Sequence, residues 1–181
     1  MSIFRPNIES LKPYEPGKPI EEVQRELGLR SVIKLASNEN PLGPPHSVVK
    51  TIQREAWRIS LYPDGSHFRL KEALSKHLGV NPQEIIVGNG SNEIIELILR
   101  CFVREGDRVV TSQLSFLVYG LITQAIGAEF VEVPMTGYKY DLRAIAGEVD
   151  ERTRVVFIAN PNNPTGTYVT RDEVLEFLDS I

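Results

Sequence analysis

The sequence is poor in residues that mark several classes of protein. Its 181 residues contain a single cysteine, Cys101, which excludes a disulfide framework and a cysteine metal cluster. Cys101 lies in an apolar helical pattern, so we expect it to pack in the core of a protein from a reducing compartment. The three histidines, His46, His67 and His77, lack metal-ligand spacing and are expected on the surface.

Charge and hydropathy exclude further classes. The 24 acidic and 20 basic side chains are mixed along the chain and give a net charge of −4, with no basic stripe for nucleic acid. No apolar run approaches the length of a membrane span, and the first residues lack a secretory signal. The sequence therefore predicts a cytoplasmic protein without nucleic-acid or membrane partners, whose 41% apolar content is enough for a core.

The first 45 residues are rich in proline, which predicts an extended N-terminal arm with one short helix over 21–27, ended by Gly28. We expect residues 46–181 to form the first part of a larger domain. Helices are predicted over 47–58 and 66–79, with Ser66 as the N-cap of the second, and a Tyr62-Pro63-Asp64-Gly65 turn separates them.

After residue 80, short apolar runs alternate with helical patterns. This alternation predicts βαβ units around a mostly parallel sheet, and therefore an α/β fold. The expected strands cover 84–88, 108–112, 129–133 and 154–159, and the expected helices cover 92–104, 116–126 and 142–149. A last helix follows the capping box that begins at Thr170 and runs to the final residue, which suggests that the sequence stops inside an element.

The most informative segment is Ala-Asn-Pro-Asn-Asn-Pro-Thr-Gly at 159–166, directly after an apolar strand. Ligands of open α/β sheets bind at the carboxyl ends of strands, and two Asn-Pro steps stiffen this loop. Asn163 carries an amide that either donates to a ligand oxygen or bonds within its own loop. We also predict that the Asn163–Pro164 bond is cis.

A second candidate site is Gly-Asn-Gly-Ser-Asn-Glu at 88–93, between a predicted strand and a predicted helix. Backbone N–H groups and the helix dipole attract an anion there. The segment is neither the dinucleotide fingerprint nor a P-loop, because the third Gly and the Lys-Ser/Thr are missing. It is either a phosphate site or an ordinary turn.

Three more side chains have open roles. Phe116 follows a strand and either presents its ring to a planar ligand or packs in the core, as Tyr119 is expected to do. Tyr62 either places a phenol near an anion or packs in its turn, and Asn38 lies on a similarly constrained polar segment. Neither a nucleophile elbow nor a Cys/His pair is present, so hydrolase functions have little support.

Four segments together resemble a known family: Asn-Glu-Asn-Pro-Leu-Gly at 38–43, Tyr-Pro-Asp at 62–64, and the segments at 88–93 and 160–166. They are similar to fold-type I pyridoxal-phosphate aminotransferases, and their order and residues resemble those of the histidinol-phosphate aminotransferase group. The resemblance implies a three-layer sandwich with a mostly parallel sheet, truncated here. It also implies pyridoxal 5'-phosphate as cofactor, and transamination between histidinol phosphate and 2-oxoglutarate in histidine biosynthesis, giving imidazole acetol phosphate and glutamate.

The resemblance also implies roles for individual residues. Ser91 and Asn92 would hold the cofactor phosphate, and Phe116 would stack on the pyridine ring. Asn163 would donate to the phenolic oxygen of that ring. Tyr62 would reach the cofactor phosphate of the second subunit in a homodimer.

Substrate contacts are implied for Tyr14 and Asn38. The resemblance places the Schiff-base lysine beyond Ile181, so this chain has no catalytic lysine of its own and is expected to be inactive alone. Another class I/II aminotransferase, an enzyme like threonine-phosphate decarboxylase, and a non-catalytic module that binds phosphate or pyridoxal phosphate remain alternatives.

Overall fold

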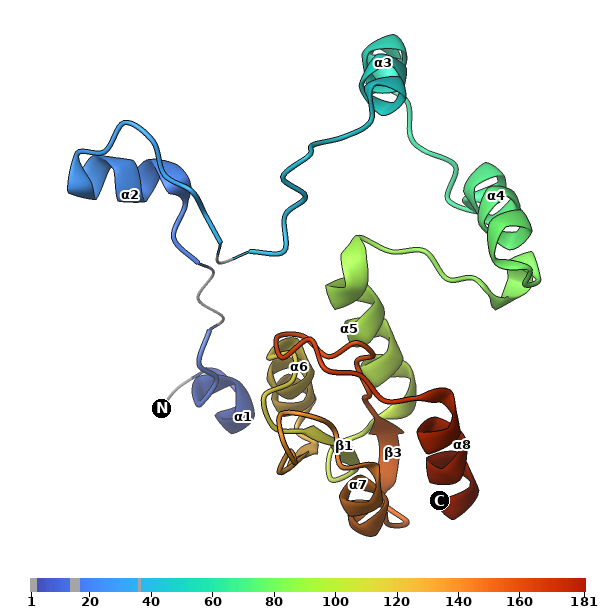
Figure 1. The fold of residues 1–181 in the computed structure, drawn as a ribbon. Coiled ribbons are helices and arrows are strands. Elements are labelled where there is room, and N and C mark those ends of the chain that lie inside the picture. Colours follow the sequence, from blue (N-terminus) through green and yellow to red (C-terminus); the bar gives the residue numbers. More distant parts are fainter. Residues whose placement is uncertain (1–2, 14–16, 36) are drawn as a thin grey trace. The chain divides into compact units, whose positions relative to one another are not determined.

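The computed structural model describes residues 3–13, 17–35 and 37–181 (Figure 1). The chain divides into two units, which are described separately below. One unit comprises Met1–Tyr14 and Val87–Ile181, and the other comprises Glu15–Ile86. In the described residues, no helix is both long enough and apolar enough to cross a membrane.

The first unit is built on a three-stranded parallel sheet of β1 (Arg108–Ser112), β2 (Glu129–Val133) and β3 (Thr153–Val156). The strand order is β2-β1-β3, so β1 lies in the middle. Val110 of β1 is opposite Val131 of β2 and Val156 of β3. The three predicted strands and their parallel arrangement are confirmed, although β3 ends three residues earlier than expected.

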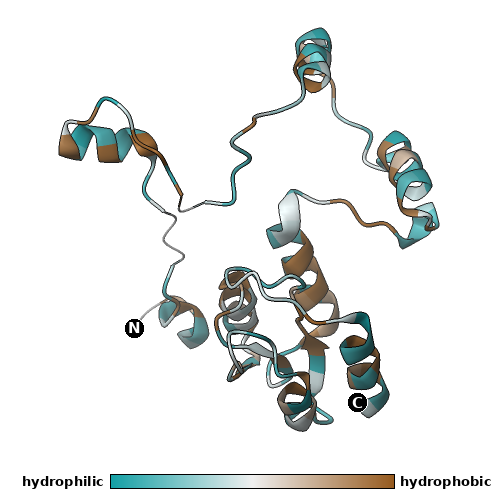
Figure 2. Ribbon diagram, viewed as in Figure 1, coloured by the Kyte–Doolittle hydropathy of each residue, from teal (hydrophilic) through white to brown (hydrophobic). Residues whose placement is uncertain are grey.

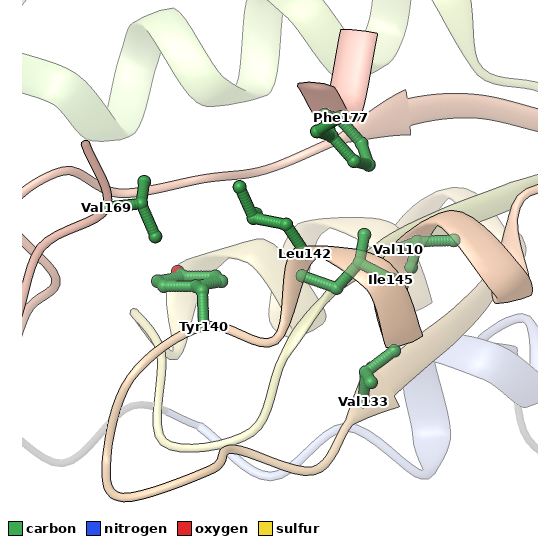
Figure 3. Packing of buried hydrophobic residues seen from close by; sticks show 7 residues of the cluster. All are labelled: Val110, Val133, Tyr140, Leu142, Ile145, Val169 and Phe177. Atoms are coloured by element: carbon green, nitrogen blue, oxygen red, sulfur yellow. The ribbon is translucent and has the colours of Figure 1, made fainter. Parts of the chain in front are cut away.

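Helices cover both faces of this sheet. On one face, α5 (Gly90–Phe102) and α6 (Val118–Ile126) share an apolar cluster with Val109. On the other face, α7 (Leu142–Glu148) and α8 (Arg171–Ser180) contribute to a cluster that contains Val110 (Figure 3). Because adjacent residues of a strand point to opposite faces, these two valines separate the clusters. The predicted three-layer α/β arrangement is confirmed.

The apolar residues of this unit gather where the helices meet the sheet, and Figure 2 shows brown segments among teal ones on its helices and strands. Leu99 of α5 and Ile145 of α7 are fully buried, one in each cluster. Burial of such a side chain stabilises the fold by about 1.5–3 kcal/mol.

One close approach depends on a glycine. A Cβ atom placed on Gly120 of α6 would lie 2.8 Å from the Phe130 ring of β2. Only a residue without a side chain lets this helix pack so near the strand.

A short helix, α1 (Pro6–Glu9), lies against α6. The Asn7 side chain donates hydrogen bonds of 2.9 Å to the carbonyl oxygens of Gln124 and Ala125, which belong to the last turn of α6. The terminal carbonyls of a helix lack intrahelical hydrogen-bond donors. Asn7 donates to two of them from a segment more than a hundred residues away in the sequence.

The second unit consists of α2 (Ile20–Leu27), α3 (His46–Glu55), η1 (Ala56–Arg58), α4 (Phe68–Leu78) and η2 (Pro82–Glu84). Gly28 and Gly79 end α2 and α4 in the left-handed conformation, as predicted. The prediction of Ser66 as an N-cap is wrong. Asp64 instead accepts hydrogen bonds from the N–H groups of Ser66 and Phe68, so the turn itself caps the helix.

Two further predictions are wrong. Residues 84–88 form no strand: the backbone at Ile85 is extended, but no other strand pairs with it in the part of the chain that is described. Cys101 is exposed rather than buried. It follows the buried Leu99 by two residues, which is about 200° around the helix, so it faces away from the core. His46, His67 and His77 are exposed, as expected.

Candidate functional site at the carboxyl edge of the sheet

The order of the strands makes the carboxyl ends of β1 and β3 a topological switch point. After β1 the chain passes to α6 on one face, whereas after β3 it passes to α8 on the other face. Adjacent parallel strands whose connections leave to opposite faces mark the usual ligand position in open α/β sheets. The segment with Phe116 follows β1, and the Asn-Pro loop follows β3.

The Asn-Pro loop (residues 159–167) is held by its own asparagines. The side chain of Asn160 donates to the carbonyl oxygen of Val169 at 2.9 Å and accepts from the Val169 N–H at 3.0 Å. The Asn163–Pro164 peptide bond is cis, as predicted, and the Asn160–Pro161 bond is cis as well.

Asn162 ties the loop to the rest of the edge. Its side chain is almost completely buried, with 3% exposure. The Nδ2 atom donates to the Leu114 carbonyl at 3.0 Å and to the Thr165 hydroxyl at 2.8 Å. Because Leu114 lies in the β1–α6 segment, this amide brings the Asn-Pro loop and the segment before Phe116 together.

Asn163 is in a different position from its neighbours. Its side chain is exposed and has no hydrogen-bond partner within the described part of the chain. The bonds that hold the loop are thus made by Asn160 and Asn162, and the amide of Asn163 is left available to a ligand. Its role toward a cofactor stays a prediction.

Tyr140 is a site residue that the sequence analysis missed. It lies between β2 and α7, is 5% exposed, and packs among Val169 and Leu142 in the cluster of Figure 3. Its hydroxyl lies 2.7 Å from the Ser115 hydroxyl and donates to Asn162 Oδ1 at 3.1 Å. No sequence motif marks Tyr140, which looks like an ordinary aromatic before a helix cap.

The segment at 88–93 forms the start of α5, which begins at Gly90, two residues earlier than predicted. The helix has no side-chain N-cap, and the N–H groups of Ser91 and Asn92 have no acceptor in the residues described. Both side chains are exposed. Since α5 runs back toward the start of β1, its N-terminus lies at the same sheet edge as the two loops.

Gly88 and Glu93 shape this helix start. The Glu93 carboxylate accepts a hydrogen bond from the Asn89 N–H and so closes one side of the turn. A Cβ atom on Gly88 would lie 2.8 Å from that carboxylate and 2.9 Å from Ile94 Cδ1. Glycine therefore allows Glu93 and Ile94 to approach the backbone this closely. The N–H groups of Ser91 and Asn92 remain available to an anion.

Phe116 is half-buried, and its ring meets Tyr119 edge to face, with centroids 5.8 Å apart. Tyr119 stacks on Phe157 at 4.1 Å and is a core residue, as predicted. Burial raises the pKa of the Tyr119 phenol, and the neighbouring Tyr140 adds to the rise. Phe116 thus packs against the core cluster without being fully buried.

The start of α8 fixes where the loop ends. Thr170 caps the helix, and the Glu173 carboxylate accepts from the Thr170 N–H at 2.6 Å. Lys139 donates to Glu173 Oε1 at 2.6 Å, which links this helix to the segment before Tyr140. The Lys139 ammonium, then the Thr170 N–H and hydroxyl, lower the pKa of Glu173 to about 2.

The remaining predicted site residues are in other parts of the chain. Asn38 and Tyr62 belong to the second unit and are exposed. Tyr14 lies outside the described residues.

The fold and this edge define a class of protein. Residues 30–181 match the family model of aminotransferase class I and II, and the chain belongs to this family. It is 49% identical to histidinol-phosphate aminotransferase of Anaeromyxobacter sp. over 100% of this chain and 50% of that protein. It is 47% identical to histidinol-phosphate aminotransferase 1 of Mannheimia succiniciproducens, over 96% and 48%.

Solved structures of aminotransferases share the fold of this chain. The histidinol-phosphate aminotransferase of Sinorhizobium meliloti, in complex with pyridoxal-5'-phosphate, superposes with a TM-score of 0.88 at 30% identity, over 100% of this chain and 48% of that one. An aspartate aminotransferase mutant of Thermus thermophilus, 19% identical, shares the fold with a TM-score of 0.79, over 99% and 48%. The chain spans about half the length of the curated relatives it matches.

Proposed function

We propose that the protein carrying this chain is a pyridoxal-phosphate-dependent aminotransferase that acts on histidinol phosphate and 2-oxoglutarate in histidine biosynthesis. One observation carries the proposal: hydrogen-bond donors without partners in the described residues lie at one edge of the sheet, namely the Asn163 amide and the uncapped N–H groups of Ser91 and Asn92. The relatives named histidinol-phosphate aminotransferase support this choice of substrate.

The residues of this edge fit pyridoxal phosphate. The phosphate requires hydrogen-bond donors, which the N–H groups at the start of α5 supply. The planar ring requires an apolar face, which the exposed part of Phe116 supplies. The phenolic oxygen requires a donor, and the amide of Asn163 is available.

Each residue then has a defined task. Ser91 and Asn92 bind the phosphate and set the position of the ring. Phe116 covers one ring face and excludes water from it. Asn163 donates to the phenolic oxygen and favours its ionised form. When bound, pyridoxal phosphate acts as an electron sink for the carbanion that forms when the substrate loses its Cα proton.

The proposal includes contacts that lie outside this edge. Tyr62 would contact the cofactor phosphate of the second subunit of a homodimer, and Tyr14 and Asn38 would contact the substrate. The boundary between an arm over 1–45 and a cofactor domain from residue 46 belongs to the same proposal, as does a cytoplasmic location. We also propose that this chain alone is inactive, because none of its seven lysines lies in the serine-rich context of the family's cofactor lysine.

The test uses the full product of the gene. Pyridoxal phosphate is added, and the forward reaction is followed by the loss of histidinol phosphate and the formation of glutamate from 2-oxoglutarate. The reverse reaction, from imidazole acetol phosphate and glutamate, is followed by the formation of histidinol phosphate. Asn163→Ala is compared with Tyr168→Phe, a variant of an exposed side chain near the same loop. We expect turnover in the wild type and in Tyr168→Phe, and a clear loss in Asn163→Ala.

Other outcomes contradict the proposal in distinct ways. Turnover with aromatic amino acids but not with histidinol phosphate would identify a different class I/II aminotransferase. Release of carbon dioxide from threonine phosphate would identify a decarboxylase, and cofactor binding without any reaction would identify a binding module. A lysine adduct trapped with borohydride in residues 1–181, together with activity of this chain alone, would disprove the inactive-fragment part.

A further inference from the structure

The buried hydroxyl of Tyr140 has no contact among those proposed for the cofactor, yet it contacts two segments at the carboxyl edge of the sheet. Ser115 comes from the segment after β1, and Asn162 and Ala159 come from the segment after β3. The hydroxyl lies 2.7 Å from Ser115 Oγ and 3.1 Å from Asn162 Oδ1, and it accepts from the Ala159 N–H at 3.3 Å.

The direction of each hydrogen bond follows from the donor inventory. Asn162 Oδ1 can only accept, so the single proton of Tyr140 goes to it. The Ser115 hydroxyl must then donate to Tyr140. On its other side, Asn162 Nδ2 places one proton on the Leu114 carbonyl and one on Thr165. The amide of Asn162 is therefore fully bonded and fixed in one orientation.

These bonds act on the residues beside them. Ser115 precedes Phe116 in the chain, and Asn162 precedes Asn163. A hydroxyl that holds Ser115 and Asn162 at fixed positions also sets the backbone from which the Phe116 ring and the Asn163 amide project. Phe116 is half-buried and Asn163 is exposed, so neither side chain is held by complete burial. The Tyr140 hydrogen bonds are therefore expected to fix the backbone from which they project.

We propose that Tyr140 is a positioning residue for the cofactor site. Its hydroxyl holds the segment after β1 and the Asn-Pro loop together, so that Phe116 and Asn163 contact the same cofactor ring. The inference rests on the proposed function for the identity of the ring. It does not rest on it for the coupling of the two loops, which is a property of the protein without cofactor.

The test compares Tyr140→Phe with Tyr138→Phe in the full product of the gene. Phenylalanine keeps the ring of Tyr140 in its apolar cluster and removes only the hydroxyl. Tyr138 lies two residues away and is 68% exposed, so its variant removes a hydroxyl of the same kind from solvent. Ser115→Ala and the double variant Tyr140→Phe/Ser115→Ala complete a cycle.

Two measurements separate positioning from general stability. Hydrogen exchange of the cofactor-free protein is followed at the Ala159 and Gly166 amides, with Val110 in the central strand as a reference. The affinity for pyridoxal phosphate, and the pH midpoint at which its bound visible absorption changes, are then determined. A role in stability alone would not move that midpoint.

We expect Tyr140→Phe to speed exchange of Ala159 and Gly166 while Val110 is unchanged, to weaken cofactor binding about tenfold, equivalent to about 1.4 kcal/mol, and to raise the pH midpoint because the Asn163 donor is less well placed. Ser115→Ala should act in the same direction, and the double variant should add little. Tyr138→Phe should match the wild type.

Unchanged exchange at Ala159 and Gly166 in Tyr140→Phe would overturn the coupling of the loops. Faster exchange with unchanged cofactor affinity and midpoint would overturn the positioning role and leave a structural one. A wild type that binds no pyridoxal phosphate would defeat the proposed function and the cofactor part of this inference, while the exchange result would still decide whether Tyr140 joins the loops.

Discussion

The Tyr140 hydroxyl donates to Asn162 Oδ1 at 3.1 Å, and this bond distinguishes Asn162 from the adjacent Asn163. Asn162 is buried and holds the loop, whereas Asn163 is exposed and free to serve a ligand. Residues of the same type, next to each other in one motif, are thus predicted to respond in opposite ways to substitution.

Asn162→Ala should reduce the free energy of unfolding by about 1–3 kcal/mol, because the Tyr140 hydroxyl and the Leu114 carbonyl lose a buried partner. Asn163→Ala should change it by less than about 0.5 kcal/mol, since its side chain is exposed. Urea denaturation of both variants measures the difference. Equal losses of stability would contradict this division of roles.

The packing of α6 on β2 gives a second prediction. Gly120→Ala should destabilise the fold by about 1–3 kcal/mol, because the new Cβ meets the Phe130 ring. Gly147→Ala is the matched control: it lies in α7 with open space around it, and should stabilise by about 0.5–1 kcal/mol. Thermal unfolding decides, and a Gly120→Ala variant as stable as wild type would show that α6 can shift.

The start of α8 should respond to acid. The pKa of Glu173 is lowered to about 2 from an ordinary value of 4.5. A lowered native pKa stabilises the fold above the unfolded pKa, and this contribution is lost as the pH falls through the native pKa. We therefore expect the stabilisation from Glu173 to be intact above pH 4.5 and to disappear between there and about pH 2.

Glu173→Gln should remove that acid-dependent part of the melting temperature and lower the melting temperature at neutral pH. Glu176→Gln is the control, because it removes one acidic charge from the same helix at an exposed position, 3.9 Å from Arg143. Parallel pH profiles for the wild type and Glu173→Gln would mean that the Lys139 and Thr170 contacts do not hold the carboxylate in solution.

The contact between α1 and α6 can be tested by hydrogen exchange. Asn7→Ala removes the two hydrogen bonds from the Asn7 amide to the Gln124 and Ala125 carbonyls and leaves only the longer Arg5 bond to Ala125, so the amides of Ile8 and Leu11 should exchange faster. Lys12→Ala changes an exposed side chain next to the same helix and should have no such effect. Equal exchange in the two variants would place the anchor of α1 in its apolar contacts instead.

Much of this fold could be predicted from the sequence because its signals are local. Apolar runs defined β1 and β2, and the glycines after α2 and α4 ended those helices. Residues 84–88 show the limit: their composition suits a strand, but a strand also requires a neighbour, and none is present in the described residues. Cys101 was misplaced because an apolar helix pattern does not by itself identify which face is buried.

The site could be predicted only in part. The Asn-Pro loop and the start of α5 were found because their residue types and spacing are unusual. Tyr140 and Ser115 were missed because their role depends on contacts between segments 25 residues apart, which no local pattern encodes. The sequence does not show which asparagine of the loop makes its internal hydrogen bonds, so the role of Asn162 was also missed.

A crystal structure of the full gene product with pyridoxal phosphate would show whether Ser91, Asn92, Phe116 and Asn163 form one cofactor site. We expect the phosphate at the N–H groups of Ser91 and Asn92, the ring against Phe116, and the phenolic oxygen within hydrogen-bond distance of the Asn163 amide. A phosphate bound elsewhere, or a phenolic oxygen turned away from Asn163, would contradict it.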